Sequence, residues 1–486
     1  MTTPSPENRL AGGVDGPMHL LELLAPTLKA VHDGARERSG PVPAGEPGAV
    51  ADSVRAVGEI LPEHGIGGEQ ALVELARVFA AGAVDPAHPA CAAHLHAPPL
   101  AVAVVADLVA SMFNSSLDSW DQAPSATAVE AEVVRAMADL VPYGDGASGV
   151  LTSGGTESNL TGMFLALEHA RRTAGNRTLR VFCSVEAHFS VGRSAGVLGI
   201  GEEFVTTVEV DAEHRMDPSA LRGAIAEARV RGELPAVIIA TAGTSDLGAI
   251  DPLPEIAAIA EEAGAWMHVD AAYGGGALFS RRLAPLLDGL SRADSVGLDL
   301  HKLGWQPVAA GVLLVRDAAL FAPLARRAAY LNTEDDEQAG YTSLLGRSLR
   351  TTRRADALKI AVTLRALGRH GMGQLVDRCH ALAWRAWELI SVQTRLEPLQ
   401  PPVLSSVVFR YLPIHGNPDL VNARLRRSLL RAGRAVIGRT ELDGRVHLKL
   451  TLLNPHTTDA ELTRLVADVV RAGQDEDRAD VVDPED

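Results

Sequence analysis

The chain has 486 residues, 47% of them hydrophobic and 22% charged, which fits a globular protein of two or three packed domains. Its net charge of -16 disfavours nucleic acid as a partner, because an acidic surface repels phosphate backbones. The sequence has no apolar stretch long enough to cross a membrane, no signal-peptide pattern, and three cysteines without CxxC spacing. We therefore expect a cytoplasmic protein that binds neither membranes nor metal ions.

The first 105 residues are expected to form a helical segment that does not fold alone. Residues 1–16 are polar and rich in glycine and proline, which predicts disorder. Apolar residues at helical spacing then predict three helices, over His19–His32, Val50–Leu61 and Gly68–Gly82.

Residues 106–365 alternate short β-branched runs with helical stretches rich in alanine and leucine. This alternation predicts a mostly parallel sheet covered by helices, in which ligands bind beyond the carboxyl ends of the strands. The expected strands are Leu179–Ser184, Glu203–Val208, Ala236–Ala240, Trp266–Val269, Ser295–Leu298 and Gly311–Val315.

A helix near Arg354–Leu367 leads into a smaller α/β domain over residues 366–473, with strands near Val403–Tyr411 and His447–Leu452. Residues 474–486 are mostly acidic or polar, which predicts a disordered tail.

The segment Thr152–Asn159 places Gly155 and Thr156 directly before an apolar helix. Glycine lets a ligand approach the backbone, and a helix N-terminus presents unpaired N–H groups and the positive end of its dipole, so this turn can hold a phosphate. A turn before an N-capped helix is the structural alternative.

Three predicted strands are followed by reactive side chains, Asp270, Lys302 and His188. The aspartate can hold a protonated heterocyclic nitrogen, the lysine can form an imine, and the histidine can stack on an aromatic cofactor. Taken singly, a capping aspartate, a solvated lysine and a structural histidine are the simpler interpretations. Together with the glycine turn they match the parts that a pyridoxal phosphate site requires.

In these motifs the chain resembles the group II pyridoxal-dependent amino acid decarboxylases over roughly residues 85–460, and most of all the bacterial diaminobutyrate and siderophore-type lysine decarboxylases. The resemblance implies decarboxylation of an L-amino acid to an amine and carbon dioxide, with pyridoxal 5'-phosphate as cofactor. It also implies a type I aminotransferase-like α/β fold and a homodimer with active sites at the subunit interface. The similar stretches are Phe113–Gln122, Ser153–Thr156, Ala240–Thr244, His268–Gly274, Arg350–Arg354 and Leu450–Pro455.

The resemblance assigns roles around the cofactor ring. Lys302 would carry the cofactor as a Schiff base, and Asp270 would bind the pyridine nitrogen. Ala272 would pack against the ring and His188 would stack on its opposite face. A loop between Tyr330 and Arg350 would close over the site, and its Tyr341, or else His188, would protonate the product carbon.

Other residues would hold the rest of the cofactor. Gly155 and Thr156 would bind the phosphate, helped by Asp299 or His301, although Asp299 replaces an asparagine of some relatives. Ser245 would lie near the cofactor's 3-hydroxyl group or support the aspartate that binds the pyridine nitrogen.

The implied substrate is a diamino acid, 2,4-diaminobutyrate or else lysine or ornithine, whose second ammonium needs a carboxylate. Another small or specialised amino acid, other chemistry on the same fold (transamination, carbon–sulfur elimination, oxidative deamination) and a non-catalytic cofactor-binding regulator remain alternatives. The candidate substrate residues, whose charges can also be merely structural or solvated, are Asp118, Asp121, His96 and the loop acids Glu334, Asp335 and Asp336.

Overall fold

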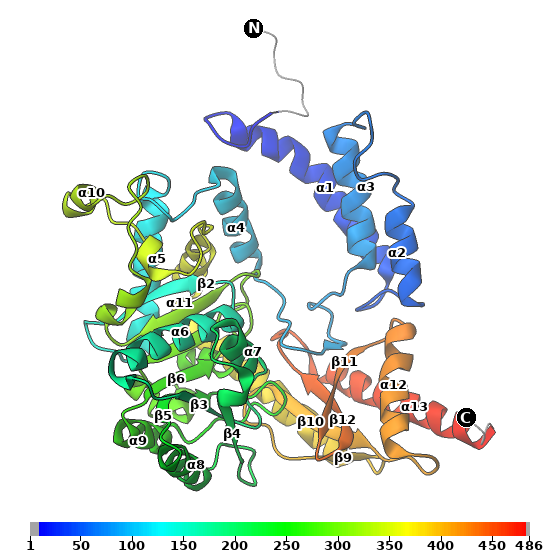
Figure 1. The fold of residues 1–486 in the computed structure, drawn as a ribbon. Coiled ribbons are helices and arrows are strands. Elements are labelled where there is room, and N and C mark those ends of the chain that lie inside the picture. Colours follow the sequence, from blue (N-terminus) through cyan, green and yellow to red (C-terminus); the bar gives the residue numbers. More distant parts are fainter. Residues whose placement is uncertain (1–8, 483–486) are drawn as a thin grey trace. The chain divides into compact units, whose positions relative to one another are not determined.

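The computed structural model describes residues 9–482, with side chains up to Arg478. These residues form two compact units. The larger unit comprises Leu95–Ala381 with Pro402–Ser406, and the smaller comprises the chain up to His94 with Leu382–Pro401 and the segment from Val407 onward. Figure 1 labels the elements of both units. No helix within residues 9–482 has the combination of length and apolar character that crossing a bilayer requires.

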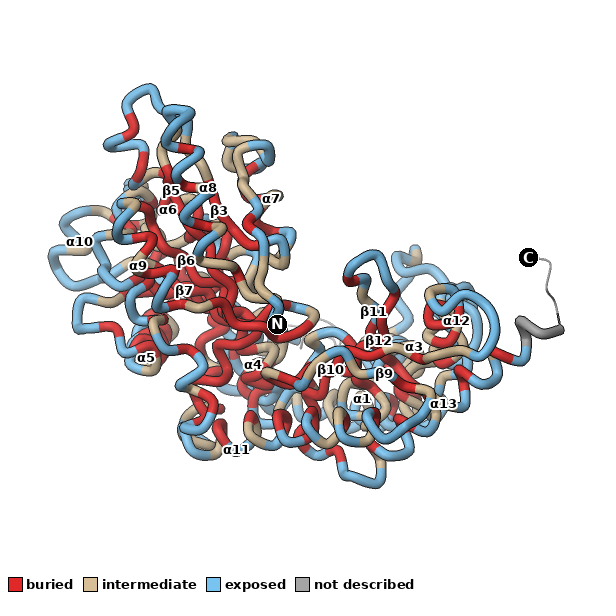
Figure 2. Tube along the Cα trace, turned by 90° about the horizontal axis from the view of Figure 1, so that it is seen from below, coloured by how far each residue is buried: buried red, intermediate tan, exposed pale blue. Residues whose placement is uncertain are grey.

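The larger unit is built on a seven-stranded sheet with the order β2-β8-β7-β6-β5-β3-β4. The strands from β7 to β4 run parallel, while β8 is antiparallel to both of its neighbours. Figure 2 shows the strands of this sheet as buried, as expected for parallel strands covered by helices. The strands are β2 (Ser148–Thr152), β3 (Leu179–Ser184), β4 (Val205–Val208), β5 (Leu234–Thr241), β6 (Trp266–Ala271), β7 (Ser295–Asp299) and β8 (Gly311–Val315).

Local sequence signals set the bounds of several helices in this unit. The Asp217 side chain accepts a hydrogen bond from the Ser219 N–H and caps α8, and α9 ends at Gly264 in the left-handed conformation. The helices are α4 (Ala101–Phe113), α5 (Pro124–Leu140), α6 (Gly155–Ala174), α7 (Ser190–Val197), α8 (Pro218–Val230), α9 (Leu253–Ala263), α10 (Glu334–Gln338) and α11 (Ala357–Ser391), which departs from helical geometry at Gly368 and continues into the smaller unit. Short 3₁₀ turns cover Glu202–Phe204, Gly274–Phe279, Ala284–Leu287, Leu290–Arg292, Ala318–Leu324 and Leu345–Arg347.

The smaller unit contains a five-stranded sheet with the order β1-β11-β12-β10-β9. Helix α13 packs Leu462, Leu465 and Val469 into the buried core of this unit. Its strands are β1 (Cys91–Ala92), β9 (Leu396–Pro398), β10 (Ser406–Tyr411), β11 (Val436–Leu442) and β12 (Arg445–Thr451), and its helices are α1 (Gly16–Arg38), α2 (Pro47–Arg55), α3 (Gly68–Gly82), α12 (Pro418–Arg431) and α13 (Asp459–Val482).

The first 94 residues include the N-terminal helices α1, α2 and α3. They belong to the same compact unit as the C-terminal sheet, and the predicted boundaries at residues 105 and 365 fall inside α4 and α11. The third predicted helix has the bounds of α3, whereas α1 extends beyond its prediction at both ends. Of the region predicted to be disordered, residues 1–8 lie outside the described residues, and α1 begins at Gly16.

The C-terminal tail departs from the prediction of disorder from residue 474, because α13 continues to Val482. Asp477 is buried, and its carboxylate accepts hydrogen bonds from the Tyr411 hydroxyl at 2.8 Å and the Ile414 N–H at 3.2 Å. Such charge-assisted bonds hold an acidic helix against the unit, which composition alone does not reveal. Residues 483–486 lie outside the described part of the chain.

Candidate active site

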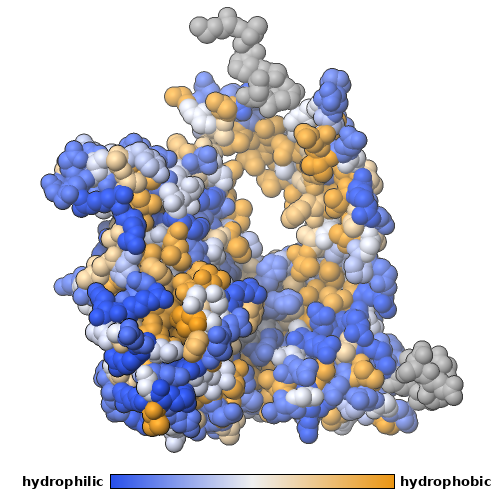
Figure 3. All heavy atoms as spheres, in the orientation of Figure 1, coloured by the Kyte–Doolittle hydropathy of each residue, from blue (hydrophilic) through white to orange (hydrophobic). Residues whose placement is uncertain are grey.

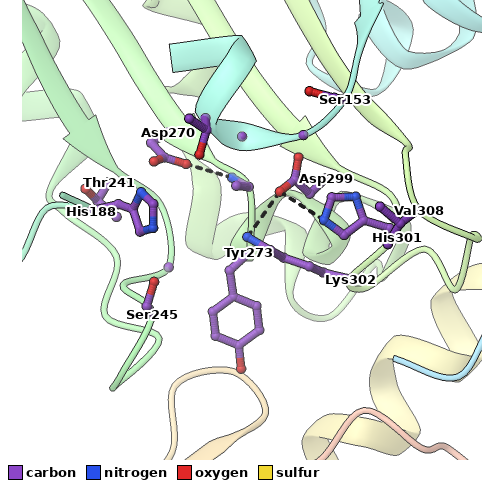
Figure 4. Close-up of a pocket in the computed structure, with 15 residues that line it drawn as sticks. Ser153, His188, Thr241, Ser245, Asp270, Tyr273, Asp299, His301, Lys302 and Val308 are labelled. Atoms are coloured by element: carbon purple, nitrogen blue, oxygen red, sulfur yellow. Dashed lines mark hydrogen bonds and ion pairs between the residues drawn. The ribbon is translucent and has the colours of Figure 1, made fainter. Parts of the chain in front are cut away.

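A pocket of about 380 Å³ lies where β5, β6 and β7 end and α6 begins. Its position follows from the parallel strands, whose carboxyl ends meet at one edge of the sheet. Figure 4 shows the polar side chains that point into it. The lining residues are Ser153, Gly154, Gly155, Thr156, His188, Thr241, Gly243, Ser245, Asp270, Ala272, Tyr273, Asp299, His301, Lys302 and Val308.

One wall of the pocket is the N-terminus of α6. Its cap residue, Gly154, offers no side-chain hydrogen bond to the helix, so the first N–H groups of α6 are available to a ligand. A Cβ atom built on Gly155 would lie only 2.8 Å from the Ala272 Cβ and 3.2 Å from Asp299 Oδ2. Glycine therefore keeps this wall open, and a 20-residue helix directs its dipole at the space.

Asp270 stands at the end of β6 and is buried. Its Oδ1 accepts a hydrogen bond from the Ala272 N–H at 3.1 Å, and its Oδ2 accepts one from Asn159 Nδ2 at 2.6 Å. The two donors, one on each oxygen, fix the orientation of this buried carboxylate. A carboxylate oriented in this way at the pocket wall can hold a protonated ring nitrogen.

Lys302, Asp299 and His301 form a second polar cluster just beyond β7. Lys302 Nζ lies 3.1 Å from Asp299 Oδ2, and His301 Nε2 lies 3.5 Å from the same oxygen. Figure 4 shows the lysine and the histidine converging on this carboxylate. Burial lowers the pKa of His301, although the nearby Asp299 acts in the opposite direction.

Three buried polar atoms on the pocket wall have no hydrogen-bond partner among the described residues: Thr241 Oγ1, Asp299 Oδ1 and His301 Nδ1. Buried polar atoms are normally paired, so their clustering here indicates a place for a polar ligand. With the open α6 N-terminus, the Asp270 carboxylate and the Lys302 amine, the residues fit a ligand that carries a phosphate, a basic ring nitrogen and a carbonyl group.

His188 follows β3 and lines the pocket from another side. Its Nδ1 lies 2.8 Å from Ser190 Oγ, which holds the ring in place. Burial lowers the pKa of His188, while the charge of Asp270 opposes this shift. A neutral imidazole can cover an aromatic ligand without adding a positive charge.

The structure gathers nine sequence-predicted residues in the pocket and leaves seven outside its lining, three of which are the loop acids Glu334, Asp335 and Asp336 on α10. The Asp118 carboxylate accepts a hydrogen bond from Gln122 Nε2 at 2.8 Å, and Asp121 accepts one from Ser119 Oγ at 2.6 Å. His96 is exposed before α4. Tyr341 is about half exposed and packs edge-on against Trp120 with ring centroids 5.0 Å apart.

Six lining residues were not among the predicted site residues. Five of them lie inside the stretches that carried the family resemblance, so the signal was present: Ser153, Gly154, Thr241, Gly243 and Tyr273. Val308 lies in no such stretch, and only the folded chain places it at the pocket.

Comparisons with known proteins agree with this geometry. A family model described as the pyridoxal-dependent decarboxylase conserved domain matches residues 53–412. An L-2,4-diaminobutyrate decarboxylase of Rhizobium meliloti (strain 1021) is 46% identical over 84% of this chain and 82% of its own length. Another from Acinetobacter baumannii is 35% identical over 84% of each chain.

Among solved structures, the glutamate decarboxylase domain of a diaminobutyrate-pyruvate transaminase and L-2,4-diaminobutyrate decarboxylase from Vibrio parahaemolyticus matches with a TM-score of 0.87 and 33% identity, covering 97% of this chain and 98% of that one. The predicted aminotransferase-like fold is confirmed. The chain therefore belongs to the family of pyridoxal-dependent amino acid decarboxylases, with pyridoxal phosphate as cofactor.

Proposed function

We propose that this enzyme removes the α-carboxylate of L-2,4-diaminobutyrate as carbon dioxide and releases 1,3-diaminopropane. The observation that carries the proposal is the similarity to two relatives that bear this activity in their names, at 46% and 35% identity over most of the chain. Lysine, ornithine and other small amino acids are the alternative substrates.

The pocket residues divide the work of the reaction. Bound pyridoxal phosphate supplies a protonated ring that takes up the electron pair left by the departing carboxylate. The N-terminus of α6 at Gly155 and Thr156 binds the phosphate, and Asp270 keeps the ring nitrogen protonated. Lys302 provides the amine through which the cofactor attaches. His188 covers one ring face and excludes water from it.

A proton must reach the substrate carbon after carbon dioxide leaves. We propose Tyr341, from the segment between Tyr330 and Arg350, as its donor, with His188 as the second candidate. The Tyr341 hydroxyl group belongs to a half-exposed side chain on a short connection after α10, a setting that allows a loop to move.

We further propose that the enzyme is a cytoplasmic homodimer with active sites at the subunit interface. Exposed apolar side chains on α1, including Leu21 and Leu28, support a subunit contact, and Figure 3 shows hydrophobic surface over this part of the chain. The three cysteines are free and buried, which fits a reducing compartment.

The substrate is tested by carbon dioxide release from the twenty common amino acids, ornithine and L-2,4-diaminobutyrate. We expect kcat/KM for L-2,4-diaminobutyrate to exceed that for ornithine, one methylene longer, by about 10- to 200-fold. Preference for an aromatic or acidic substrate would contradict the substrate proposal and leave the family assignment intact.

Product analysis separates the remaining alternatives. Ammonia or a carbonyl product would indicate transamination, elimination or oxidative deamination, and cofactor binding without turnover would indicate a regulator. Lys302→Ala should lose both turnover and the imine that borohydride traps. For the second ammonium, Asp118, Asp121 and His96 remain our candidates, and Asp121→Asn should raise KM for L-2,4-diaminobutyrate while the cofactor spectrum stays unchanged.

A further inference from the structure

Behind Asp270 lies a continuous row of four buried polar side chains. Trp266 Nε1 lies 2.8 Å from Ser295 Oγ, which lies 2.8 Å from His268 Nδ1. His268 Nε2 lies 3.0 Å from Asn159 Oδ1, and Asn159 Nδ2 lies 2.6 Å from Asp270 Oδ2. All four members are at most 4% exposed.

The chemistry of the two ends fixes the direction of every hydrogen bond in this row. A carboxylate only accepts, so Asn159 must turn its amide N–H toward Asp270 and its oxygen toward His268. That oxygen requires a hydrogen on His268 Nε2, and burial keeps the imidazole neutral by lowering its pKa to about 4. His268 Nδ1 is therefore an acceptor.

The remaining two bonds follow from the same logic. The Ser295 hydroxyl must donate to His268 Nδ1, and its oxygen accepts from Trp266, whose indole nitrogen can only donate. All hydrogens in the row thus point toward Asp270. A row of this kind polarises each of its members in the same sense and favours negative charge at its end.

Asn159 also connects Asp270 with His188 on the opposite side of the pocket. Its Nδ2 lies 3.1 Å from Ser190 Oγ, and Ser190 Oγ lies 2.8 Å from His188 Nδ1. The Ser190 N–H also points at His188 Nδ1, at 3.3 Å, so this nitrogen is an acceptor. The two hydrogens of one amide nitrogen therefore serve the two groups expected on the nitrogen and the face of the cofactor ring.

We propose that Asn159 is a positioning residue that orients the Asp270 carboxylate toward the ring nitrogen, through its bond to His268 and the row behind it, and that also fixes His188 through Ser190. This inference rests on the proposed pairing of Asp270 with the ring nitrogen of the cofactor. Asn159 touches neither substrate nor the reacting carbon in this scheme and acts through its neighbours alone.

The test compares two cofactors and two variants. Purified enzyme is stripped of cofactor, and the dissociation constants of pyridoxal phosphate and of its 1-deaza analogue, which carries C–H in place of the ring nitrogen, are measured by equilibrium dialysis. Asn159→Leu should weaken pyridoxal phosphate binding roughly 10- to 100-fold, because it removes a hydrogen bond to a buried charge. Trp266→Phe, at the far end of the row, should weaken it a few-fold.

The analogue separates positioning of Asp270 from a general loss of packing. With it, the Asn159→Leu penalty should shrink to within a few-fold of the unmodified enzyme and the Trp266→Phe penalty should disappear, since no ring nitrogen is present to respond to Asp270. Equal penalties with both cofactors would overturn the proposal. If the unmodified enzyme binds both cofactors equally well, the pairing of Asp270 with the ring nitrogen fails, and the inference about Asn159 fails with it.

A matched control guards against damage to the fold. Asn422 is also fully buried, and within the described part of the smaller unit its side chain bonds to backbone atoms of Tyr411 and Pro418. Asn422→Leu should lower stability and leave the ratio of the two dissociation constants unchanged. If Asn159→Leu does not fold, Trp266→Phe carries the same comparison, and an unchanged ratio of dissociation constants in that variant would overturn the proposal.

Discussion

His268 shows how burial of a single residue links the site to the stability of the protein. Its ring is fully buried between Ser295 and Asn159. Burial lowers its pKa to about 4, and the attraction of Asp270 for a positive charge only partly offsets this effect. The folded protein therefore holds this imidazole neutral at pH values where an unfolded chain would protonate it.

This shift predicts a loss of stability in mild acid. An unfolded histidine titrates near pH 6.5, so between about pH 6.5 and pH 4 the unfolded state binds the additional proton. The free energy of unfolding should fall by about 3 kcal/mol across this window from His268 alone. Urea titrations at several pH values give the free energy of unfolding as a function of pH. Between pH 6.5 and pH 4 this free energy should fall less steeply for His268→Gln than for the unmodified enzyme. His64→Gln at an exposed position is the control and should keep the pH dependence of the unmodified enzyme. An unchanged pH dependence of the free energy of unfolding in His268→Gln would contradict the prediction.

At the scale of elements, α6 serves the site at two points. Its first turn forms the open wall at Gly155, and one turn beyond Asn159 its backbone passes directly beneath His268. A Cβ atom built on Gly162 would lie 2.6 Å from His268 Nδ1. Glycine at this position lets the helix approach the sheet closely enough for Asn159 to reach both His268 and Asp270.

Gly162→Ala should therefore destabilise the enzyme and weaken its binding of pyridoxal phosphate. Alanine inside a helix normally stabilises by about 0.5–1 kcal/mol relative to glycine, but here the methyl group displaces a buried ring. Thermal unfolding should give a lower Tm, and dialysis a higher Kd for the cofactor. Gly223→Ala in α8, where the added methyl group meets no atom within 4 Å, should instead raise Tm. Equal gains in both variants would contradict this account.

At the scale of the whole molecule, the exposed apolar surface is the feature that a single chain leaves unexplained. Leu21 and Leu28 lie seven residues apart on α1 and are each about 60% exposed. The opposite side of α1 packs closely on α3, where a Cβ atom on Gly34 would meet the Arg77 carbonyl oxygen. One side of α1 thus contacts α3, and the other side presents apolar side chains suited to a contact with a second subunit.

The proposed homodimer gives a prediction for this surface. The double substitution Leu21→Glu and Leu28→Glu should convert a dimer into monomers in sedimentation velocity, because burial of two carboxylates without partners is costly. Decarboxylase activity should fall in parallel, since we expect the active sites at the interface. Val230→Glu, at the exposed end of α8, is the control and should leave the sedimentation coefficient unchanged. A double variant that remains dimeric would exclude α1 as the contact.

Much of the fold was predictable because its signals are local. The strands Leu179–Ser184 and Gly311–Val315 have the predicted bounds, since short apolar runs between turn residues are typical of buried strands. The acidic end of α13 was not predictable in this way. Its order depends on the contact of Asp477 with Tyr411, 66 residues earlier in the chain.

The candidate site also contains residues that local sequence patterns predicted and features that only the folded chain shows. The sequence by itself determined that Gly155, His188, Asp270 and Lys302 lie near one another at the pocket. Each follows a strand or begins a helix at the edge of the sheet where the carboxyl ends of the parallel strands meet. Asp118 and Asp121, which stay candidates for the second ammonium, lie outside the lining of this pocket and bond to Gln122 and Ser119 of their own segment.

Only the tertiary structure decided what supports those residues. In the sequence Asn159 is one polar residue of a helix, and the partners that give it a role lie 109 and 111 residues away. The row behind Asp270 exists because the register of β6 and β7 pairs His268 with Ser295 and because α6 approaches at Gly162. Chain-local patterns fix which side chains reach the edge of a sheet, whereas register and helix packing fix which buried partners stand behind them.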